Sequence, residues 1–240
     1  MQMNIRVCDD IDAVSRAAMD ETMGALREAV EQRGRFAIAL SGGHTPAKMY
    51  ALWASEPYRS ETPWDRAHLF WSDERYVPPD DPLSNFRMTR EALISRVPIP
   101  AANVHAVPTT LPTPQAAADA YEKDLRNFFG ASAPQFDVQL LGLGPEGHTA
   151  SLFPGSAALA EKNRWVLPVE VDATPPRRLT FTPVVLNQGR KTMFLVAGKD
   201  KREIVSALRN EPDAAARQYP AAQIRPNGDV LWLLDRAAAG

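Results

Sequence analysis

Short apolar runs alternate with helix-length amphipathic segments along almost the whole chain of 240 residues. Brief apolar runs between turn residues are typical of buried strands, and apolar positions spaced three and four apart are typical of helices. We expect strands at 5–8, 36–40, 68–71, 104–107, 137–141, 165–171 and 193–196, with 230–234 as a further candidate. We expect helices at about 11–32, 46–55, 84–95, 115–129 and 200–209.

Strands that alternate with helices favour right-handed crossovers between parallel strands. The alternation therefore predicts a Rossmann-like α/β fold, with a doubly wound, mostly parallel sheet and helices on both of its faces. The chain length suits one large domain or two small ones, and the unbroken alternation leads us to expect a single domain over residues 1–240.

Composition and charge argue against several classes of protein. The net charge is −2, from 27 basic and 29 acidic residues, with no long block of one sign, which argues against a nucleic-acid surface. The one cysteine, Cys8, excludes an intrachain disulfide and a cysteine-based zinc site. We see neither a secretory signal nor an apolar run long enough for a membrane span. We therefore expect a cytoplasmic protein with no membrane association.

The first polar loop follows the strand expected at 36–40 and reads Ser41-Gly-Gly-His-Thr-Pro46. A strand, a glycine turn and a helix with proline in its first turn together direct backbone N–H groups at an anion. A phosphate would fit this turn. The alternative is an ordinary turn in which Thr45 caps the helix, and the short motif leaves both interpretations open.

The second polar loop follows the strand expected at 68–71 and begins with Asp73, Glu74 and Arg75. Adjacent opposite charges usually form a solvated loop that contributes little to stability. Their position at the carboxyl end of a strand favours a site, because ligands of open parallel sheets bind outside those ends. The following Ser84-Asn85 pair is typical of a helix cap.

The third loop contains Gly142, Gly144 and Gly147, a formal match to the dinucleotide motif, with acidic Glu170 at a suitable distance. That motif requires a long helix at its third glycine, whereas proline and glycine follow here within eight residues, so we do not expect nicotinamide binding. The loop also holds His148, which we expect near a helix start, where it would stay neutral and serve as a base.

His148 is the best candidate base among the four histidines. His44 lies in the first loop, while His68 and His105 belong to expected strands. The three loops all leave carboxyl ends of predicted parallel strands, and those ends meet at one edge of a sheet. We therefore expect one site there.

These segments resemble a known family. Ser41-Gly-Gly-His-Thr-Pro, Asp73-Glu-Arg-Tyr-Val-Pro with Ser84-Asn85, and the long segment 141–155 are similar to the signatures of bacterial-type 6-phosphogluconolactonases. These belong to the glucosamine-6-phosphate isomerase/6-phosphogluconolactonase family. Arg178-Leu-Thr and Gly198-Lys-Asp-Lys201 follow in the family's order. Two positions depart from it: Glu146 stands where the lactonases usually have aspartate, and His44 replaces a serine.

The resemblance implies hydrolysis of 6-phospho-D-glucono-1,5-lactone in the oxidative pentose phosphate pathway by a water molecule that His148 activates. It implies no cofactor and no metal, and a protein that is a monomer or a weak homo-oligomer. The partner would be the phosphorylated sugar lactone alone. The implied substrate-binding residues are Ser41, Gly42, Gly43, His44, Thr45, Arg178 and Lys201, and the implied catalytic residues are His148, Asp73, Arg75 and Glu146.

Three alternatives are open at this stage. The related glucosamine-6-phosphate deaminases carry a catalytic glutamate where this chain has Phe153, and a tyrosine where it has Arg75. A non-catalytic sugar-phosphate sensor would need a DNA-binding segment, and we find no basic recognition helix. A serine nucleophile could be Ser41 or Ser151, but neither lies in a G-x-S-x-G motif.

Overall fold

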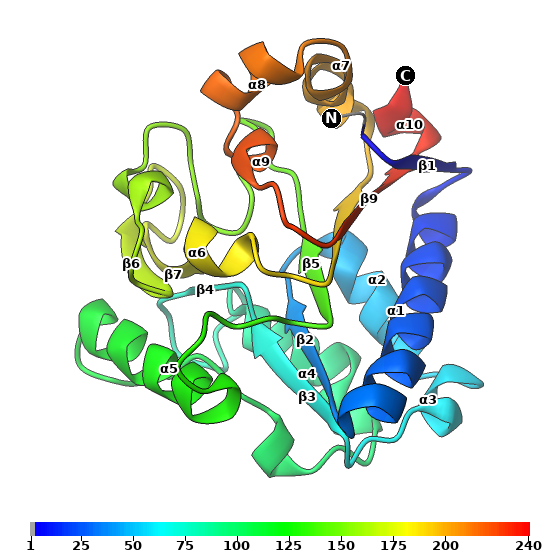
Figure 1. The fold of residues 1–240 in the computed structure, drawn as a ribbon, viewed down its shortest axis with the longest axis vertical. Helices are drawn as coiled ribbons and strands as arrows, with labels where there is room; N and C mark the ends of the chain where they lie inside the picture. The colour runs from blue at the N-terminus through cyan, green and yellow to red at the C-terminus, as the bar shows by residue number, and fades with distance from the viewer. Residues whose placement is uncertain (1–2) are drawn as a thin grey trace.

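The computed structural model describes residues 3–240 and is built around a six-stranded parallel sheet (Figure 1). The strand order across this sheet is β1-β9-β8-β5-β2-β3, and every pair is parallel. Its strands are β1 (Ile5–Cys8), β2 (Phe36–Leu40), β3 (Ala67–Trp71), β5 (Val138–Leu141), β8 (Lys191–Val196) and β9 (Asp229–Asp235). The prediction of a mostly parallel α/β sheet is confirmed.

Helices cover both faces of this sheet. They are α1 (Ile11–Arg33), α2 (His44–Trp53), α3 (Tyr58–Glu61), α4 (Asn85–Ala92), α5 (Pro114–Phe129), α6 (Pro183–Leu186), α7 (Arg202–Asn210), α8 (Pro212–Gln218), α9 (Pro220–Gln223) and α10 (Arg236–Ala239). Short 3₁₀ turns are η1 (Ile94–Arg96), η2 (Ala101–Asn103), η3 (Ala157–Ala160) and η4 (Lys199–Lys201).

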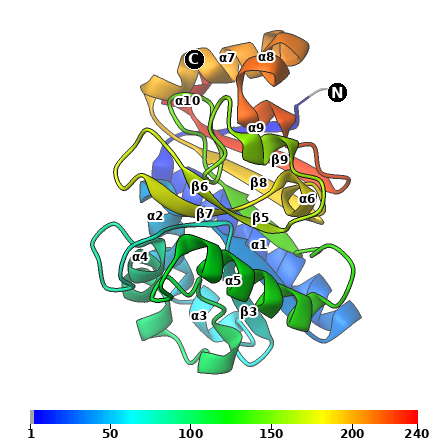
Figure 2. The same cartoon turned by 90° about the vertical axis from the view of Figure 1, so that its left-hand side faces the viewer.

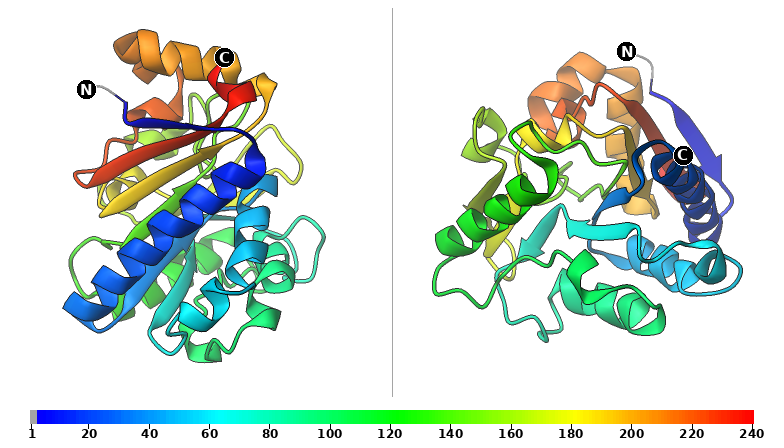
Figure 3. Two further views of the ribbon diagram at one scale, coloured as in Figure 1. Left: turned by 90° about the vertical axis from the view of Figure 1, so that its right-hand side faces the viewer. Right: turned by 60° about the horizontal axis from the view of Figure 1, so that its bottom comes forward.

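The long helix α1 shows how the sequence sets these boundaries. Asp10 accepts a hydrogen bond from the Ala13 N–H at 2.7 Å and so caps the start of the helix. The helix ends at Gly34, whose φ of 71° is the left-handed conformation that glycine adopts without strain. The buried side of α1 packs beside α2 across one face of the sheet (Figure 3). The opposite face carries α5 (Figure 2).

A second, antiparallel sheet lies beside α5 and has the strand order β4-β7-β6 (Figure 2). Its strands are β4 (Asp73–Arg75), β7 (Arg177–Phe181) and β6 (Val166–Glu170). Ser72 joins the two sheets, because its N–H donates to Leu40 O at 2.9 Å and its carbonyl accepts the Phe181 N–H at 2.7 Å. The chain thus passes from the parallel sheet into the small one directly before Asp73.

One expectation about strands is wrong. The run 104–107 makes only a single bridge to β3, at Leu69 and Val104, because it follows the η2 turn directly and is itself followed by Pro108, which has no N–H to donate. The run 165–171 forms a strand, β6, as expected, and this strand belongs to the small antiparallel sheet. Strands β4 and β7 have no counterpart among the expected elements.

The order in which the chain adds strands to the sheet changes direction between β2 and β5. From β2 the chain continues to β3 on one side, and it later returns to β5 on the other side of β2. Loops at such a switch point diverge and leave a crevice where ligands of open α/β sheets bind. The loops in question are those that carry Ser41 and His148.

Within residues 3–240, we find no helix with both the length and the apolar character needed to cross a membrane.

Candidate active site

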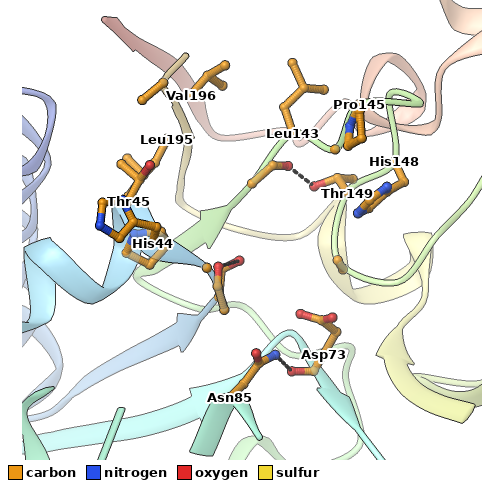
Figure 4. Close-up of a pocket in the computed structure, with 18 of the residues that line it drawn as sticks. His44, Thr45, Asp73, Asn85, Leu143, Pro145, His148, Thr149, Leu195 and Val196 are labelled. Carbon is orange, nitrogen blue, oxygen red and sulfur yellow. Dashed lines mark hydrogen bonds between the residues drawn. The ribbon is translucent and has the colours of Figure 1, made fainter. Parts of the chain in front are cut away.

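A pocket of about 310 Å³ opens at the switch point between β2 and β5 (Figure 4). This volume lies at the small end of the range of ligand pockets, roughly 300–1,000 Å³. The pocket gathers residues from all three polar loops and from β7 and η4. Ten of the eleven expected site residues line it, namely Ser41, Gly42, Gly43, His44, Thr45, Asp73, Arg75, His148, Arg178 and Lys201. The eleventh, Glu146, contacts His148 from the side.

The first loop is held by a tyrosine from the helix that follows it. The Tyr50 hydroxyl donates to Ser41 O at 2.8 Å and accepts the Ser41 N–H at 3.0 Å, so the loop starts from a fixed, buried point. Gly43, with φ of 106°, precedes α2, which begins at His44. Thr45 therefore lies inside the first turn, and the alternative in which Thr45 caps the helix is wrong. The N–H groups at the start of α2 are left for a ligand.

Asp73 is buried and oriented by a serine from the third loop. The Ser151 hydroxyl donates to Asp73 Oδ2 at 2.8 Å, and both residues are less than a tenth exposed. Ser151 is fully buried and does not line the pocket. The geometry therefore disfavours Ser151 as a nucleophile and makes it a support for the Asp73 carboxylate.

Glu74 points away from the pocket and holds the start of α4. Its carboxylate accepts the N–H groups of Asn85 at 2.8 Å and Phe86 at 2.7 Å. Ser84 caps the same helix through the Arg87 N–H, as expected. Burial raises the pKa of Glu74 to about 7, although these backbone hydrogen bonds favour the charged carboxylate and act in the opposite direction.

Arg75 and Arg178 place two guanidinium groups at the pocket. The residues are directly opposite each other in the β4–β7 ladder. Burial, together with the positive charge of Arg75, lowers the pKa of Arg178. Arg75 Nη1 donates to Leu83 O at 2.7 Å, but its buried Nε has no hydrogen-bond partner. Because two guanidinium groups lie at one corner of the pocket, this corner suits an anion.

His148 is oriented by Glu146 and by an aromatic ring. Its Nδ1 lies 2.8 Å from Glu146 Oε2, and its ring stacks on Phe153 with the centroids 4.1 Å apart. Burial acts against ionisation of Glu146, but the hydrogen bond to His148 and the smaller effects of a backbone hydrogen bond and of the charges of His148 and Lys201 together lower the pKa of Glu146. A carboxylate at Nδ1 places the proton there and leaves Nε2 with its lone pair. In Figure 4, His148 extends from the loop after β5 into the space it shares with Asp73.

No helix starts at His148, so the expectation that a helix terminus acts on its imidazole is wrong. The backbone instead turns back on itself: the Gly144 N–H donates to His148 O at 2.9 Å. Ala150 has a positive φ of 49°, and Pro154 and Gly155 follow before a helix could form. The group that contacts the imidazole is the side chain of Glu146 and not a helix terminus.

Close contacts at Gly144 and Gly147 leave no room for a side chain at these two positions of the loop. A Cβ on Gly144 would lie 2.0 Å from the His148 ring, and a Cβ on Gly147, whose φ is 75°, would lie 2.4 Å from Tyr219. The Ala221 N–H donates to Gly147 O at 3.0 Å. The formal dinucleotide motif therefore reflects the packing of the His148 loop against the segment between α8 and α9.

The remaining expected residues differ in their surroundings. Lys201, at the end of η4, lines the pocket and pairs with the exposed Asp200 at 2.8 Å. His44 is exposed at the start of α2. His68 and His105 lie outside the pocket and contact each other, with 3.2 Å between His68 Nδ1 and His105 Nε2.

Sequence reasoning missed two polar residues of the pocket, Asn85 and Thr149. Asn85, interpreted only as part of a helix cap, lines the pocket and donates from Nδ2 to Asp73 O at 2.9 Å (Figure 4). Its position directly after a capping serine hid this second role. Across residues 3–240, no cluster of three or more His, Cys, Asp or Glu side chains could hold a metal ion.

Comparison with known proteins identifies the family. The family model described as glucosamine-6-phosphate isomerases/6-phosphogluconolactonase matches residues 9–232. The chain belongs to this family. The match spans all three loops of the pocket and every strand except β1 and the last three residues of β9.

Relatives within the family carry lactonase names. The chain is 42% identical to a 6-phosphogluconolactonase from Nostoc sp., over 99% of this chain and 98% of the relative. It is 39% identical to a 6-phosphogluconolactonase from Mycobacterium tuberculosis, over 100% of this chain and 98% of the relative. The crystal structure of 6-phosphogluconolactonase from Thermotoga maritima superposes with a TM-score of 0.83 at 32% identity, covering 98% of this chain and 100% of that one.

Proposed function

We propose that the protein hydrolyses 6-phospho-D-glucono-1,5-lactone to 6-phosphogluconate, a step of the oxidative pentose phosphate pathway. One observation carries the mechanism: Glu146 holds His148 through Nδ1 and leaves Nε2 as a base in a pocket lined by Arg75, Arg178 and Lys201. The lactonase names of relatives that match the full chain support the choice of substrate.

The phosphate is proposed to bind at the start of α2. The backbone of Gly42, Gly43 and Thr45 offers N–H groups there, beside the side chains of Ser41 and His44, and the helix dipole favours an anion. Lys201 and Arg178 supply charge-assisted hydrogen bonds from the opposite wall. This anchoring places the lactone carbonyl in the part of the pocket that His148 faces.

His148 then acts as base and acid in turn. Nε2 removes a proton from a water molecule as the water oxygen bonds to the lactone C1. The carbonyl electrons move to oxygen, and the positively charged guanidinium group of Arg75, which lines the pocket, stabilises that oxyanion. When the tetrahedral intermediate collapses, the C1–O5 bond breaks and the His148 proton passes to the departing ring oxygen. Asp73, held by Ser151, orients Arg75 or the water.

Phe153 argues against the deaminase chemistry of the wider family. Its apolar ring stacks on His148, where a deaminase carries a proton-transferring glutamate. A stacked ring can shield the imidazole from bulk water but cannot move a proton. This contact therefore favours hydrolysis of a lactone over release of ammonia from an amino sugar.

A direct assay separates these activities. We would follow loss of freshly generated 6-phosphogluconolactone by NMR with and without the enzyme, and in parallel measure ammonia released from glucosamine 6-phosphate. We expect accelerated lactone hydrolysis and no ammonia. Lactone loss at the spontaneous rate would refute the proposal and leave a sugar-phosphate sensor.

The cytoplasmic location, and the state as a monomer or weak homo-oligomer, stay predictions.

A further inference from the structure

The side chain of Asn85 has a defined orientation at the floor of the pocket. Asn85 begins α4 and is 2% exposed, yet it lines the pocket. Its Nδ2 donates to the backbone carbonyl of Asp73 (Figure 4). Because a carbonyl oxygen can only accept, the nitrogen of the amide must face Asp73. The amide oxygen, Oδ1, therefore faces the other way.

Oδ1 lies against the first loop. A Cβ on Gly42 would be only 2.0 Å from this oxygen, so the two groups are in direct contact. Within residues 3–240, the buried side-chain nitrogen and oxygen atoms that lack a partner are Arg75 Nε and Gln139 Oε1. Asn85 Oδ1 has no protein donor and is not one of these buried atoms, so it is open to the pocket.

The backbone of Asn85 is fixed from both sides. Its N–H donates to Glu74 Oε1 at 2.8 Å, and its carbonyl accepts from the Thr89 hydroxyl at 2.9 Å. Thr89 is itself fully buried. Oδ1 is thus a preorganised acceptor, held by a second layer of hydrogen bonds, which is the arrangement expected of a recognition group.

The chemistry of the acceptor limits what can face it. A phosphate dianion or an oxyanion offers only acceptor oxygens and would be repelled by Oδ1. A hydroxyl group can donate. We propose that Asn85 Oδ1 accepts a hydrogen bond from a ring hydroxyl of the sugar lactone and so selects hydroxylated substrates. This inference rests on the proposed lactonase function.

A substrate series tests the inference. We would measure kcat/KM for 6-phosphogluconolactone and its 2-, 3- and 4-deoxy forms, with wild-type enzyme and Asn85→Ala. The kcat/KM of the wild type should be about 10-fold or more lower for one deoxy form than for the parent lactone, because that substrate leaves Oδ1 without a donor. The Asn85→Ala substitution should lower kcat/KM for the parent lactone by a similar factor. For the affected deoxy form, the variant and the wild type should have nearly equal kcat/KM, because the hydrogen bond is already missing, as in a double-mutant cycle.

Asn103→Ala is the matched control. Asn103 is another buried asparagine, but its Nδ2 donates to the carbonyls of Trp64 and Asp65 outside the pocket, so this variant should keep the wild-type preference among the four lactones. Equal kcat/KM of the wild type on all four lactones would overturn the inference and leave the lactonase function standing, whatever the variant does. Failure to hydrolyse any of the four would overturn the lactonase function and this inference with it.

Discussion

Arg75 and Arg178 face each other across the β4–β7 ladder, and neither forms an ion pair with a carboxylate in the part of the chain the structure describes. Like charges directly opposite in an antiparallel pair destabilise each other. The desolvation of Arg178 adds to this cost. An anion bound between the two guanidinium groups would relieve both effects, so the free pocket is electrostatically prepared for a phosphorylated, carbonyl-bearing substrate.

Arg178→Ala and Lys201→Ala should mainly raise the KM for 6-phosphogluconolactone, by about 10- to 100-fold, because an anchored phosphate contributes equally to binding the substrate and the transition state. Steady-state kinetics would measure this. Arg177→Ala is the matched control, since the neighbouring Arg177 does not line the pocket and lies over Tyr76. If both pocket variants keep the wild-type KM, the phosphate binds elsewhere.

His148→Asn should reduce kcat by about 10²- to 10⁴-fold, the usual contribution of a single general base. The fold should survive, because the side chain is at the pocket surface and its neighbours can reorganise. Circular dichroism would check folding and the NMR assay would check turnover. His68→Asn, a substitution outside the pocket, should leave kcat unchanged. A folded His148→Asn enzyme with near wild-type turnover would remove His148 from the mechanism.

Glu74 should make stability depend on pH. Its folded-state pKa of about 7 is above the ordinary value of 4.5, so the folded protein holds this proton where the unfolded chain has lost it. The contribution of Glu74 to the free energy of unfolding should therefore fall by about 3 kcal/mol as the pH rises from 4.5 through 7. Urea unfolding at several pH values would measure the difference between the wild type and Glu74→Gln.

The control for this measurement is Glu91→Gln, because Glu91 is an exposed carboxylate on α4, the helix whose start Glu74 holds. It should not alter the pH dependence of unfolding near neutral pH. A difference between the wild type and Glu74→Gln that stays constant from pH 5 to 8 would mean that Glu74 ionises normally.

Phe153→Glu should not give the enzyme deaminase activity. A lone carboxylate beside His148 would lack the tyrosine that deaminases carry at the position of Arg75 and would lack supporting hydrogen bonds. Coupled ammonia detection with glucosamine 6-phosphate should stay at background for both this variant and the wild type. Release of ammonia by the wild type at a rate near its lactone hydrolysis would reverse the choice between the two chemistries.

The sequence predicted the location of those site residues whose position the parallel sheet determines. Ser41, Asp73 and His148 follow three apolar runs that are strands, and parallel strands bring their carboxyl ends to one edge, so their meeting was predictable. The small sheet was not predictable, because β4 is only three polar residues and becomes a strand through its register with β7. Arg178 entered the expected site by resemblance alone, since nothing in its local sequence places it opposite Arg75.

The contacts that orient individual side chains could also not be predicted from the sequence. Glu146 entered the expected site by resemblance, but its contact with His148, two residues along a tight turn, could not be predicted from the sequence. The Ser151 hydroxyl reaches Asp73 from 78 positions away in the chain. Contacts of this kind depend on the final packing of loops, for which residue patterns carry no periodic signal.

The residues of the proposed site are divided between the two sheets that meet at Ser72. The turn proposed for the phosphate and the base His148 extend from the parallel sheet, whereas Asp73, Arg75 and Arg178 belong to the small one. The angle between the sheets sets how far the base is from the guanidinium groups. Aromatic stacking such as that of Phe136 on Phe181, with centroids 5.6 Å apart, helps fix that angle. The rate of turnover therefore depends on how the two sheets are aligned. A substitution in the core, remote from the substrate, can slow the reaction while the chain stays folded.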